Sequence, residues 1–220
     1  MEDFYSSELF CGVSPQEYDK MIECFQPIVK SFKAGDLVCD YSFFNENVAI
    51  VQNGELQMIR IDSDGNRTIL ENLGTNSVFG KVLTFIPVQP DDSFFLVCTK
   101  DCAVMFIEYR HIVRRCEKAC THHSKLVENM LRLISMRAVE LSLKVEILSQ
   151  RSIRGKLTAY FKSEAQRQQK KNCKIGFSYS DLADYLCVDR CAMMRELKKM
   201  REENIVQTNG KTFSLVCENQ

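Results

Sequence analysis

The sequence predicts an α+β protein in three consecutive parts, and one observation in each part leads to this prediction. Over residues 1–120, short apolar runs alternate with glycine-containing turns, which is typical of a small roll or sandwich of β-strands. Over residues 121–150, apolar residues repeat at helical spacing. Over residues 151–220, two helices joined by a short break precede a hairpin.

The composition is that of a globular protein. The chain has 220 residues, 45% hydrophobic and 26% charged, which is enough for one or two domains with a sizeable core. No apolar run approaches the ~20 residues that a membrane helix needs, and the acidic start MEDFYSSELF differs from a signal peptide. We therefore expect a cytoplasmic protein whose eleven cysteines are reduced thiols.

The net charge of zero hides an asymmetry along the chain. Residues 1–120 hold 11 Lys and Arg against 18 Asp and Glu, whereas residues 152–220 hold 13 against 8. A basic third on a neutral chain favours contact of that end with a polyanion, although uneven surface charge alone is the competing explanation.

Local signals define the elements of the first part. Ser14, Pro15 and Glu17 form a helix start in which Ser14 is the cap and Glu17 stands three residues later. Asp64-Gly65 predicts a hairpin between LQMIRI and RTIL. The corners of the roll are expected at its glycines, which are Gly35, Gly54, Gly65, Gly74 and Gly80.

The second part is predicted to be a dimerisation helix. Its apolar residues are spaced alternately four and three positions apart, a 3.5-residue period typical of a coiled-coil seam. The members of this stripe are Val127, Leu131, Ile134, Ala138, Leu141, Val145 and Leu148. Leu126, Met130 and Leu133 form a second stripe, interrupted by Arg137, that we expect to face the roll. The alternative is a helix packed entirely on its own domain.

Three polar residues predict helix starts in the last part. They are Ser152, Ser178 and Asp189, and each precedes a stretch with apolar residues at helical spacing. QQKKNCKIG is read as a polar loop, and Asn209-Gly210 is expected to form the turn of a final hairpin. This order of elements is that of a winged helix-turn-helix.

The helix after Asp189 has two faces at 100° per residue. Met193, Leu197 and Met200 share the predicted core face. The opposite face is predicted to carry cations. Recognition helices place a face of this kind in the major groove of DNA, where arginine is the usual reader of guanine. We expect DNA contacts, to bases or to phosphates, from Ser178, Ser180, Arg190, Cys191, Met194, Arg195, Lys198, Lys199 and Lys211. An ordinary solvated helix face is the alternative.

The segment FSYSDLADYLCVDRCAMMRELKKMREENIVQTNGKTFSLV resembles the DNA-binding domain of the CRP/FNR family of bacterial transcription regulators, and the resemblance covers nearly the whole chain. It is most specific at LADYLCVDRCAMMREL and at VFG. It implies a cyclic-nucleotide-binding-like jelly roll as sensor (1–120), a dimerisation helix (121–150) and a DNA-binding domain (151–220). It further implies a cytoplasmic homodimer on a near-palindromic promoter site in double-stranded DNA, with RNA polymerase as a partner.

The resemblance also places Arg190, Cys191 and Arg195 in the major groove. Many family members carry glutamate at the position of Cys191, and a thiol cannot accept a hydrogen bond from cytosine as a carboxylate does. We therefore expect a DNA site different from the one that glutamate-bearing members prefer. Cys187 replaces a glycine frequent in the turn, which suggests a slightly different turn conformation.

The family's cyclic-nucleotide pocket resembles FGKVLTF followed by PDDSFFLV, so the effector pocket is expected at Phe79, Gly80, Lys81, Val82, Asp92 and Ser93. Lys81 stands where cyclic-AMP binders carry glutamate, and Asp92 where they carry arginine. An aspartate beside a phosphate is repulsive and lacks the charge-assisted hydrogen bonds of arginine. We therefore predict no tight binding of cyclic AMP, and an unknown small effector or none. Two roles are open for Lys81: it holds an anionic group of that effector, or it forms a salt bridge with Asp92 or another carboxylate.

No cofactor or metal is predicted. Cys11, Cys24 and Cys39 are too far apart in sequence for the tight cluster of the family's iron–sulfur branch. Cys116 and Cys120, one helical turn apart, could bind metal or form a redox pair but are better explained as buried thiols. The candidate haem ligands His111, His122 and His123 all lie in polar helical surroundings.

Two other classes of function compete with a DNA-binding regulator. No phosphate-binding glycine loop, nucleophile elbow or two-histidine zinc helix is present, so we expect no catalytic residues and no enzyme. The second alternative is a cyclic-nucleotide-like regulatory or protein-interaction module that does not act on DNA. Such a module would not need the basic C-terminal part.

Overall fold

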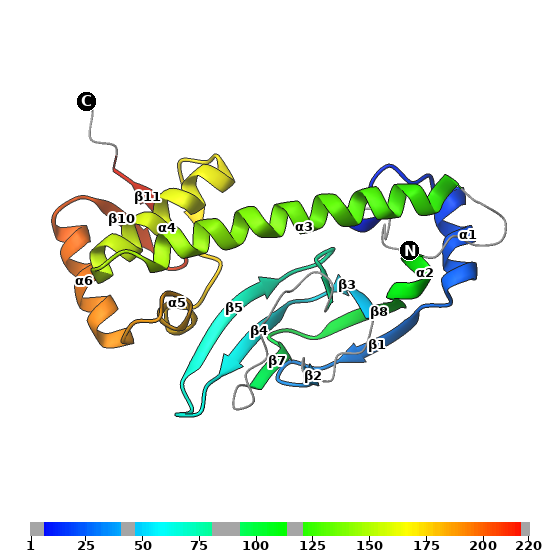
Figure 1. Ribbon diagram of the computed structural model, residues 1–220. Coiled ribbons are helices and arrows are strands. Elements are labelled where there is room, and N and C mark those ends of the chain that lie inside the picture. The colour runs from blue at the N-terminus through cyan, green and yellow to red at the C-terminus, as the bar shows by residue number, and fades with distance from the viewer. Residues whose placement is uncertain (1–6, 41–46, 81–92, 114–120, 217–220) are drawn as a thin grey trace. The chain divides into compact units, whose positions relative to one another are not determined.

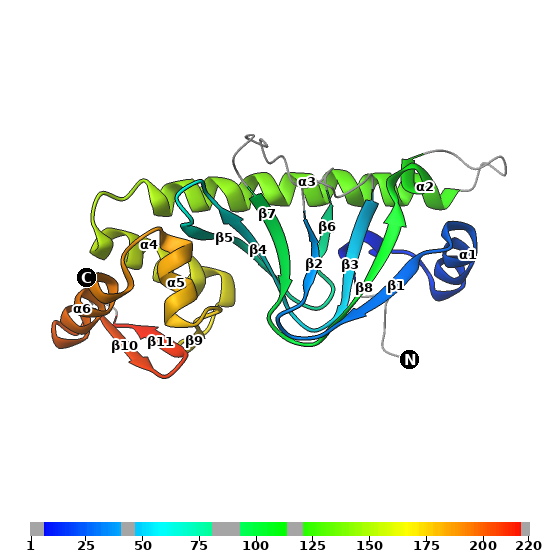
Figure 2. The ribbon, with the colours of Figure 1, turned by 90° about the horizontal axis from the view of Figure 1, so that it is seen from below.

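Two four-stranded antiparallel sheets and a long helix dominate the N-terminal half of the computed structural model (Figures 1 and 2). The structure describes residues 7–40, 47–80, 93–113 and 121–216. The chain divides into two compact units, Met1–Arg137 and Ala138–Gln220, and each is described by itself. No helix in the described part of the chain is both long and apolar enough to cross a membrane.

The first unit opens with a short 3-10 helix, η2 (Glu8–Phe10), and with helix α1 (Pro15–Phe25). The predicted start of α1 is confirmed. The Ser14 hydroxyl accepts a hydrogen bond from the Glu17 amide, and the Glu17 carboxylate accepts one from the Ser14 amide at 2.9 Å. Tyr18, Met21 and Phe25 form the buried face of this helix.

The predicted roll is confirmed as a jelly roll of two sheets, with strand orders β1-β8-β3-β6 and β2-β7-β4-β5. The strands are β1 (Ile28–Phe32), β2 (Leu37–Asp40), β3 (Asn47–Asn53), β4 (Leu56–Ile61), β5 (Arg67–Leu73), β6 (Val78–Gly80), β7 (Ser93–Cys98) and β8 (Cys102–Glu108). Alternate residues of β3 enter different cores, since side chains of a strand point to opposite faces. Ala49 and Val51 lie in the core shared with the second sheet, whereas Val48 and Ile50 pack with the helices.

Tight turns connect these strands. The predicted hairpin joins β4 to β5, which pair from Ile61 opposite Arg67, and its five-residue loop is held by the Asp62 carboxylate. That carboxylate accepts hydrogen bonds from the amides of Asp64 and Asn66 at 3.0 and 2.8 Å. Gly54 has φ +87°, and a Cβ there would lie 2.2 Å from the carbonyl oxygen of Asp101, so this corner requires glycine.

Two helices complete the unit, α2 (Tyr109–Val113) and α3 (Thr121–Leu148). Helix α3 begins before the predicted apolar repeat and crosses the boundary between the units. Leu126, Met130 and Leu133 are buried in the core with α1 and the roll, as expected of the second stripe. The first stripe is largely exposed in the single chain: Ile134 and Leu148 are half-buried, whereas Val127, Leu131, Ala138, Leu141 and Val145 are exposed.

The second unit packs the end of α3, three further helices and a small sheet around one core. Its elements are α4 (Ile153–Gln168), β9 (Cys173–Lys174), α5 (Tyr179–Leu186), α6 (Arg190–Glu202), β10 (Val206–Asn209) and β11 (Thr212–Leu215). All three predicted caps are confirmed, because Ser152, Ser178 and Asp189 each accept a hydrogen bond from the backbone amide three residues later.

Two details of this unit differ from the predictions. The segment read as a polar loop contains strand β9, which pairs with β11 through Cys173 opposite Phe213. The final hairpin forms, but Asn209 pairs with Thr212, so its turn residues are Gly210 and Lys211 rather than Asn209 and Gly210. Strand β9 arises from pairing with a strand distant in sequence, which local turn signals do not specify.

Cys187 ends helix α5 in the left-handed conformation, with φ 52° and ψ 56°. Its amide donates to carbonyl oxygens at the end of the helix. Glycine most often occupies such a position, because a Cβ is disfavoured in this region. The turn therefore keeps the conformation typical of glycine, and the expectation that Cys187 changes it is wrong.

Candidate nucleic-acid interface and effector region

Helix α6 presents one apolar and one cationic face. Met193, Leu197 and Met200 are fully buried in the core of the second unit, as predicted. The residues expected at bases or phosphates lie on the other side: Arg190, Cys191, Arg195, Lys198 and Lys199 are exposed, and Met194 is half-buried. Within the described part of the chain, neither Arg190 nor Arg195 has an ion-pair partner, so both guanidinium groups are available to a ligand.

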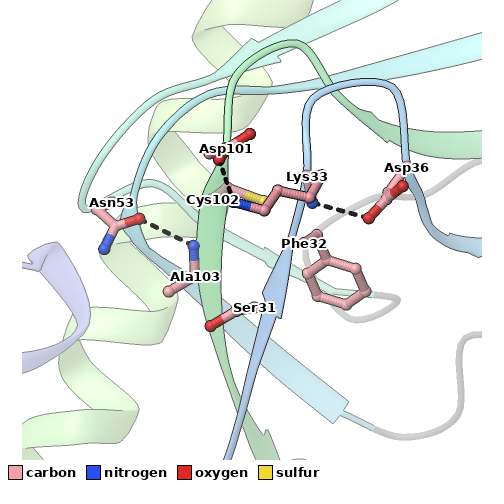
Figure 3. Close-up of a pocket in the computed structure, with 8 residues that line it drawn as sticks. All are labelled: Ser31, Phe32, Lys33, Asp36, Asn53, Asp101, Cys102 and Ala103. Atoms are coloured by element: carbon pink, nitrogen blue, oxygen red, sulfur yellow. Dashed lines mark hydrogen bonds and ion pairs between the residues drawn. The ribbon is translucent and has the colours of Figure 1, made fainter.

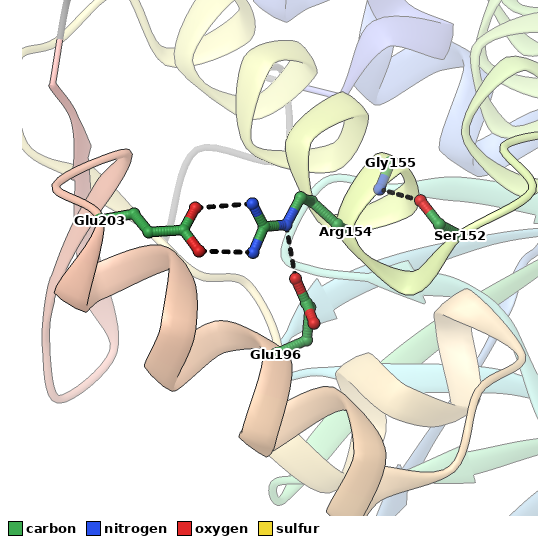
Figure 4. Close-up of polar contacts among 5 residues, drawn as sticks. All are labelled: Ser152, Arg154, Gly155, Glu196 and Glu203. Carbon is green, nitrogen blue, oxygen red and sulfur yellow. Dashed lines mark hydrogen bonds and ion pairs between the residues drawn. The ribbon is translucent and has the colours of Figure 1, made fainter.

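Arg154 binds the carboxylates of Glu196 in α6 and of Glu203, the residue that ends α6 (Figure 4). Its guanidinium donates to both carboxylate oxygens of Glu203 at 2.6 and 2.9 Å, and to Glu196 at 2.5 Å. This three-bond arrangement raises the pKa of Arg154 and lowers that of Glu203. It joins the first turn of α4 to α6 and to the residue that ends α6. Sequence reasoning missed it, because the partners are 42 and 49 positions apart.

The expected phosphate contacts lie around the start of α5 and the wing turn. Lys211 and Ser180 are exposed. The Ser178 hydroxyl is already used in the cap, since it accepts from the Asp181 amide at 3.1 Å and donates to the Asp181 carboxylate at 2.8 Å. The hydroxyl of Tyr179 donates to the Gly210 carbonyl at 3.0 Å and holds the wing turn against the start of α5.

A contact not anticipated from the sequence links α3 to α5. The ammonium of Lys144 lies 4.4 Å from the ring centroid of Tyr185, in a cation–π arrangement. Burial lowers the pKa of Lys144 to about 8. Lys156 of α4 donates to the Leu186 carbonyl at 3.0 Å. The last turn of α5 is therefore bound by cations from both α3 and α4.

Only part of the expected effector pocket can be placed. Lys81, Val82 and Asp92 lie outside the described residues. Phe79 is buried in the inter-sheet core, Ser93 at the start of β7 is exposed, and Gly80 ends β6. A Cβ on Gly80 would lie 2.6 Å from the carbonyl oxygen of Asn47. The close approach of β6 to β3 thus explains the glycine without reference to a ligand.

Arg137 lies next to this region and explains the interruption of the second stripe. Its guanidinium forms an ion pair with Glu71 on β5 and donates to the carbonyl of Val78 on β6 at 3.0 Å. Both side chains of the pair are mostly buried. An apolar side chain at this position could not satisfy that carbonyl, so the arginine ties α3 to the strand that carries Phe79 and Gly80.

A separate polar pocket of about 260 Å³ opens at one end of the roll (Figure 3). It is lined by Ser31, Phe32, Lys33, Asp36, Asn53, Asp101, Cys102 and Ala103. Its polar groups bond to one another: Lys33 pairs with Asp101 at 2.7 Å, and the Asn53 side chain accepts from the Ala103 amide at 3.0 Å. These contacts stabilise the connections between strands and leave the pocket poorly suited to an effector.

The described cysteines are free thiols. Burial raises the pKa of Cys39 and of Cys98 to about 12, which keeps both protonated and poorly reactive. Within the described residues, no three His, Cys, Asp or Glu side chains gather as metal ligands. Cys116 and Cys120 lie outside those residues, as do the side chains of His122 and His123. The Nδ1 atom of His111 lies 3.2 Å from the carbonyl oxygen of Phe25.

Comparison with known proteins agrees with this architecture. Residues 29–119 match the family model of the cyclic nucleotide-binding domain. CprK in complex with OCPA has 13% sequence identity and a TM-score of 0.71, covering 89% of this chain and 88% of its own. The c-di-GMP responsive global regulator CLP of Xanthomonas campestris has 16% identity and a TM-score of 0.68, covering 90% and 99%.

A transcriptional regulator of the CRP/FNR family from Thermus thermophilus has 14% identity and a TM-score of 0.57, over 86% of this chain and 94% of its own. No curated protein sequence matches this one. At such identities the solved structures establish the fold. Residues 29–119 are therefore similar in sequence to cyclic nucleotide-binding domains, and the chain as a whole has the fold of the CRP/FNR transcription regulators that it resembles.

Proposed function

We propose that the chain is a homodimeric, sequence-specific DNA-binding transcription regulator, controlled by an effector other than cyclic AMP. One observation carries the proposal: α6 exposes Arg190 and Arg195 opposite its buried face, while Arg154 binds the carboxylates of Glu196 and Glu203 and offsets part of their negative charge. A helix with this charge distribution is attracted to DNA through its exposed face.

The proposed contacts divide by chemistry. Arg190, Cys191, Met194 and Arg195 lie in the first two turns of α6 and would meet base edges in the major groove. The remaining residues supply charge or hydrogen bonds to phosphates: Ser178, Ser180, Lys198, Lys199 and Lys211. The hydroxyl of Ser178 is hydrogen-bonded to Asp181, so Ser178 would contribute by capping the start of α5.

The exposed stripe on α3 supports a symmetric dimer. Leu131 and Val145 are 62% and 67% exposed in the single chain, although both are large and apolar. A second copy of the same helix would bury them in a coiled-coil seam. Two α6 helices related by this symmetry would read half-sites about one DNA turn apart in a near-palindromic site.

The remaining assignments follow from this function. We assign sensing to residues 1–120, dimerisation to 121–150 and DNA binding to 151–220. RNA polymerase is the expected partner at a promoter, and the cytoplasm is where a bacterial regulator meets chromosomal DNA. The proposed mechanism is a two-state dimer in which the effector changes the spacing of the two α6 helices through α3 and the segment near Gln150–Ser152.

The effector is proposed to bind in the roll near Phe79 and Gly80, with Lys81, Val82, Asp92 and Ser93 around it. CprK is described as complexed with OCPA and CLP as responsive to c-di-GMP, so proteins of this fold take unlike effectors. Lys81 and Asp92 reverse the charges that cyclic AMP needs. Calorimetry should therefore detect no micromolar binding of cyclic AMP, and such binding would refute this part of the proposal.

Selection of bound duplexes from a random-sequence pool, followed by mobility-shift titration, tests the proposed function. A preferred near-palindromic duplex should bind at least a thousandfold more tightly than random DNA, with a steep salt dependence. If no sequence is enriched and affinity is the same for all duplexes, the chain is better explained as a protein-interaction module that does not act on DNA.

A further inference from the structure

A cationic segment, residues 169–174, comprises the connection after α4 and the two residues of β9; we call it the 169–174 loop, and it lies outside the helices assigned to DNA recognition. From Ala165 to Ser180 the sequence holds Arg167, Lys170, Lys171 and Lys174 and no acidic residue. Arg167 is paired with Glu164 at 2.7 Å, whereas the three lysines are exposed. The loop therefore adds three positive charges per chain to the surface of the second unit.

Hydrogen bonds hold this loop in one shape. The side-chain amide of Gln168 donates to the Lys174 carbonyl at 2.7 Å and accepts from the Lys174 amide at 2.8 Å, closing the loop at its base. The buried thiol of Cys173 donates to the Lys170 carbonyl at 3.1 Å. The main chain that carries the lysines is thus ordered before any partner binds, which reduces the entropic cost of binding.

The small sheet places the loop beside the wing. Cys173 and Phe213 pair across β9 and β11, and both are buried. Lys174 and Thr212, the next pair, must point to the outer face, since side chains alternate along strands. The Ile175 amide donates to the Lys211 carbonyl at 2.7 Å, so β9 is joined to the wing turn (Figure 2 shows β9 beside β11).

The composition of this surface indicates the class of its partner. Between Val145 and Val216, a range that the structure describes without a gap, no large apolar side chain is exposed. A specific protein interface has an apolar or aromatic core, which this surface lacks. Flexible lysines without apolar neighbours instead suit the evenly spaced phosphates of a nucleic acid.

On the basis of the proposed function, we propose that the 169–174 loop contacts the phosphate backbone of DNA flanking each half-site, and so extends the DNA contact beyond the base pairs that α6 reads. The contact is independent of base sequence. Lys170, Lys171 and Lys174 supply the charge, and Gln168 is a positioning residue.

Two duplexes and three variants test this inference. The preferred sequence is placed in a duplex of ~20 base pairs that ends at the half-sites, and in one of ~40 base pairs. The triple substitution Lys170→Gln, Lys171→Gln, Lys174→Gln should weaken binding to the long duplex by about tenfold or more at ~0.15 M salt. It should lower the salt slope by about 0.9 for each lost contact. Binding to the short duplex should change less than about twofold.

Gln168→Leu keeps the lysines but removes the two hydrogen bonds to the backbone of Lys174. It should lower the affinity for the long duplex by less than the triple substitution does, and leave the affinity for the short duplex unchanged. Lys20→Gln, at an exposed lysine of the first unit, is the charge control and should leave both affinities unchanged. If the triple variant binds the long duplex as tightly as the parent, the inference is wrong. This is also the result expected if the lysines bind an acidic protein instead of DNA. Unchanged binding by the triple variant refutes only this inference, provided that the parent protein prefers the selected sequence over random DNA. If the parent protein shows no such preference, both this inference and the proposed function are wrong.

Discussion

The guanidinium of Arg154 binds the carboxylate of Glu203 through two parallel hydrogen bonds, at 2.6 and 2.9 Å (Figure 4). The third bond, to Glu196, makes Arg154 the common partner of Glu196 in α6 and of Glu203, the residue that ends α6. A single planar cation thus holds α6 to α4 and offsets one of the two negative charges.

Arg154→Lys should loosen this attachment. A lysine has the charge but cannot form the paired hydrogen bonds to Glu203 and reach Glu196 at the same time. We expect a lower melting temperature, measured by circular dichroism, and severalfold weaker binding to the preferred duplex. Arg151→Lys, an exposed arginine just before α4, is the matched control. Equal melting temperatures and affinities for both variants would show that the cluster contributes nothing.

Glu203 predicts a pH dependence of stability. Its pKa in the folded chain lies below the ordinary 4.5, chiefly because its carboxylate accepts hydrogen bonds from Arg154. Its contribution is therefore complete above pH ~5 and is lost as the pH falls through the lowered pKa. The parent should unfold at higher urea than Glu203→Gln at pH 6, with the difference shrinking below pH 4. A difference that stays constant down to pH 3 would contradict this.

Cys187→Gly should stabilise the chain. The left-handed conformation costs a residue with a Cβ about 1–2 kcal/mol, and glycine loses part of that gain through its greater freedom in the unfolded chain. The net gain expected in the free energy of unfolding is about 0.5–1 kcal/mol. The exposed Cys191, within helix α6, provides the contrast, since Cys191→Gly should be destabilising. Urea denaturation measures both, and a loss of stability in Cys187→Gly would refute the strain argument.

Leu131→Lys should break the proposed dimer. The substitution places a charge in the coiled-coil seam, where an unpaired cation is costly to bury. Sedimentation equilibrium should show at least a hundredfold weaker dimerisation. Met136→Lys, at an exposed residue of α3 off the stripe, should leave the dimer intact. If the parent chain is itself a monomer, or if both variants dimerise equally, the stripe on α3 is not the dimer interface.

Structural elements that depend on residues close together in the sequence could be predicted. Ser152, Ser178 and Asp189 cap helices because their side-chain oxygens reach the free amides of the first turn, which depends on neighbours three residues away. The buried face of α6 follows equally from helical periodicity. The ion pairs of Arg154 and Arg137, and strand β9, depend on partners 38 to 66 positions away, which no local pattern indicates.

The central claim is that α6 reads DNA bases, and Arg195→Ala tests it most directly. Repeating the duplex selection with this variant should show relaxed preference at one base pair per half-site. Affinity for the parent's preferred duplex should fall by about 1–3 kcal/mol. An unchanged sequence preference, with affinity equal to that of the parent, would contradict the assignment of α6 as the recognition helix.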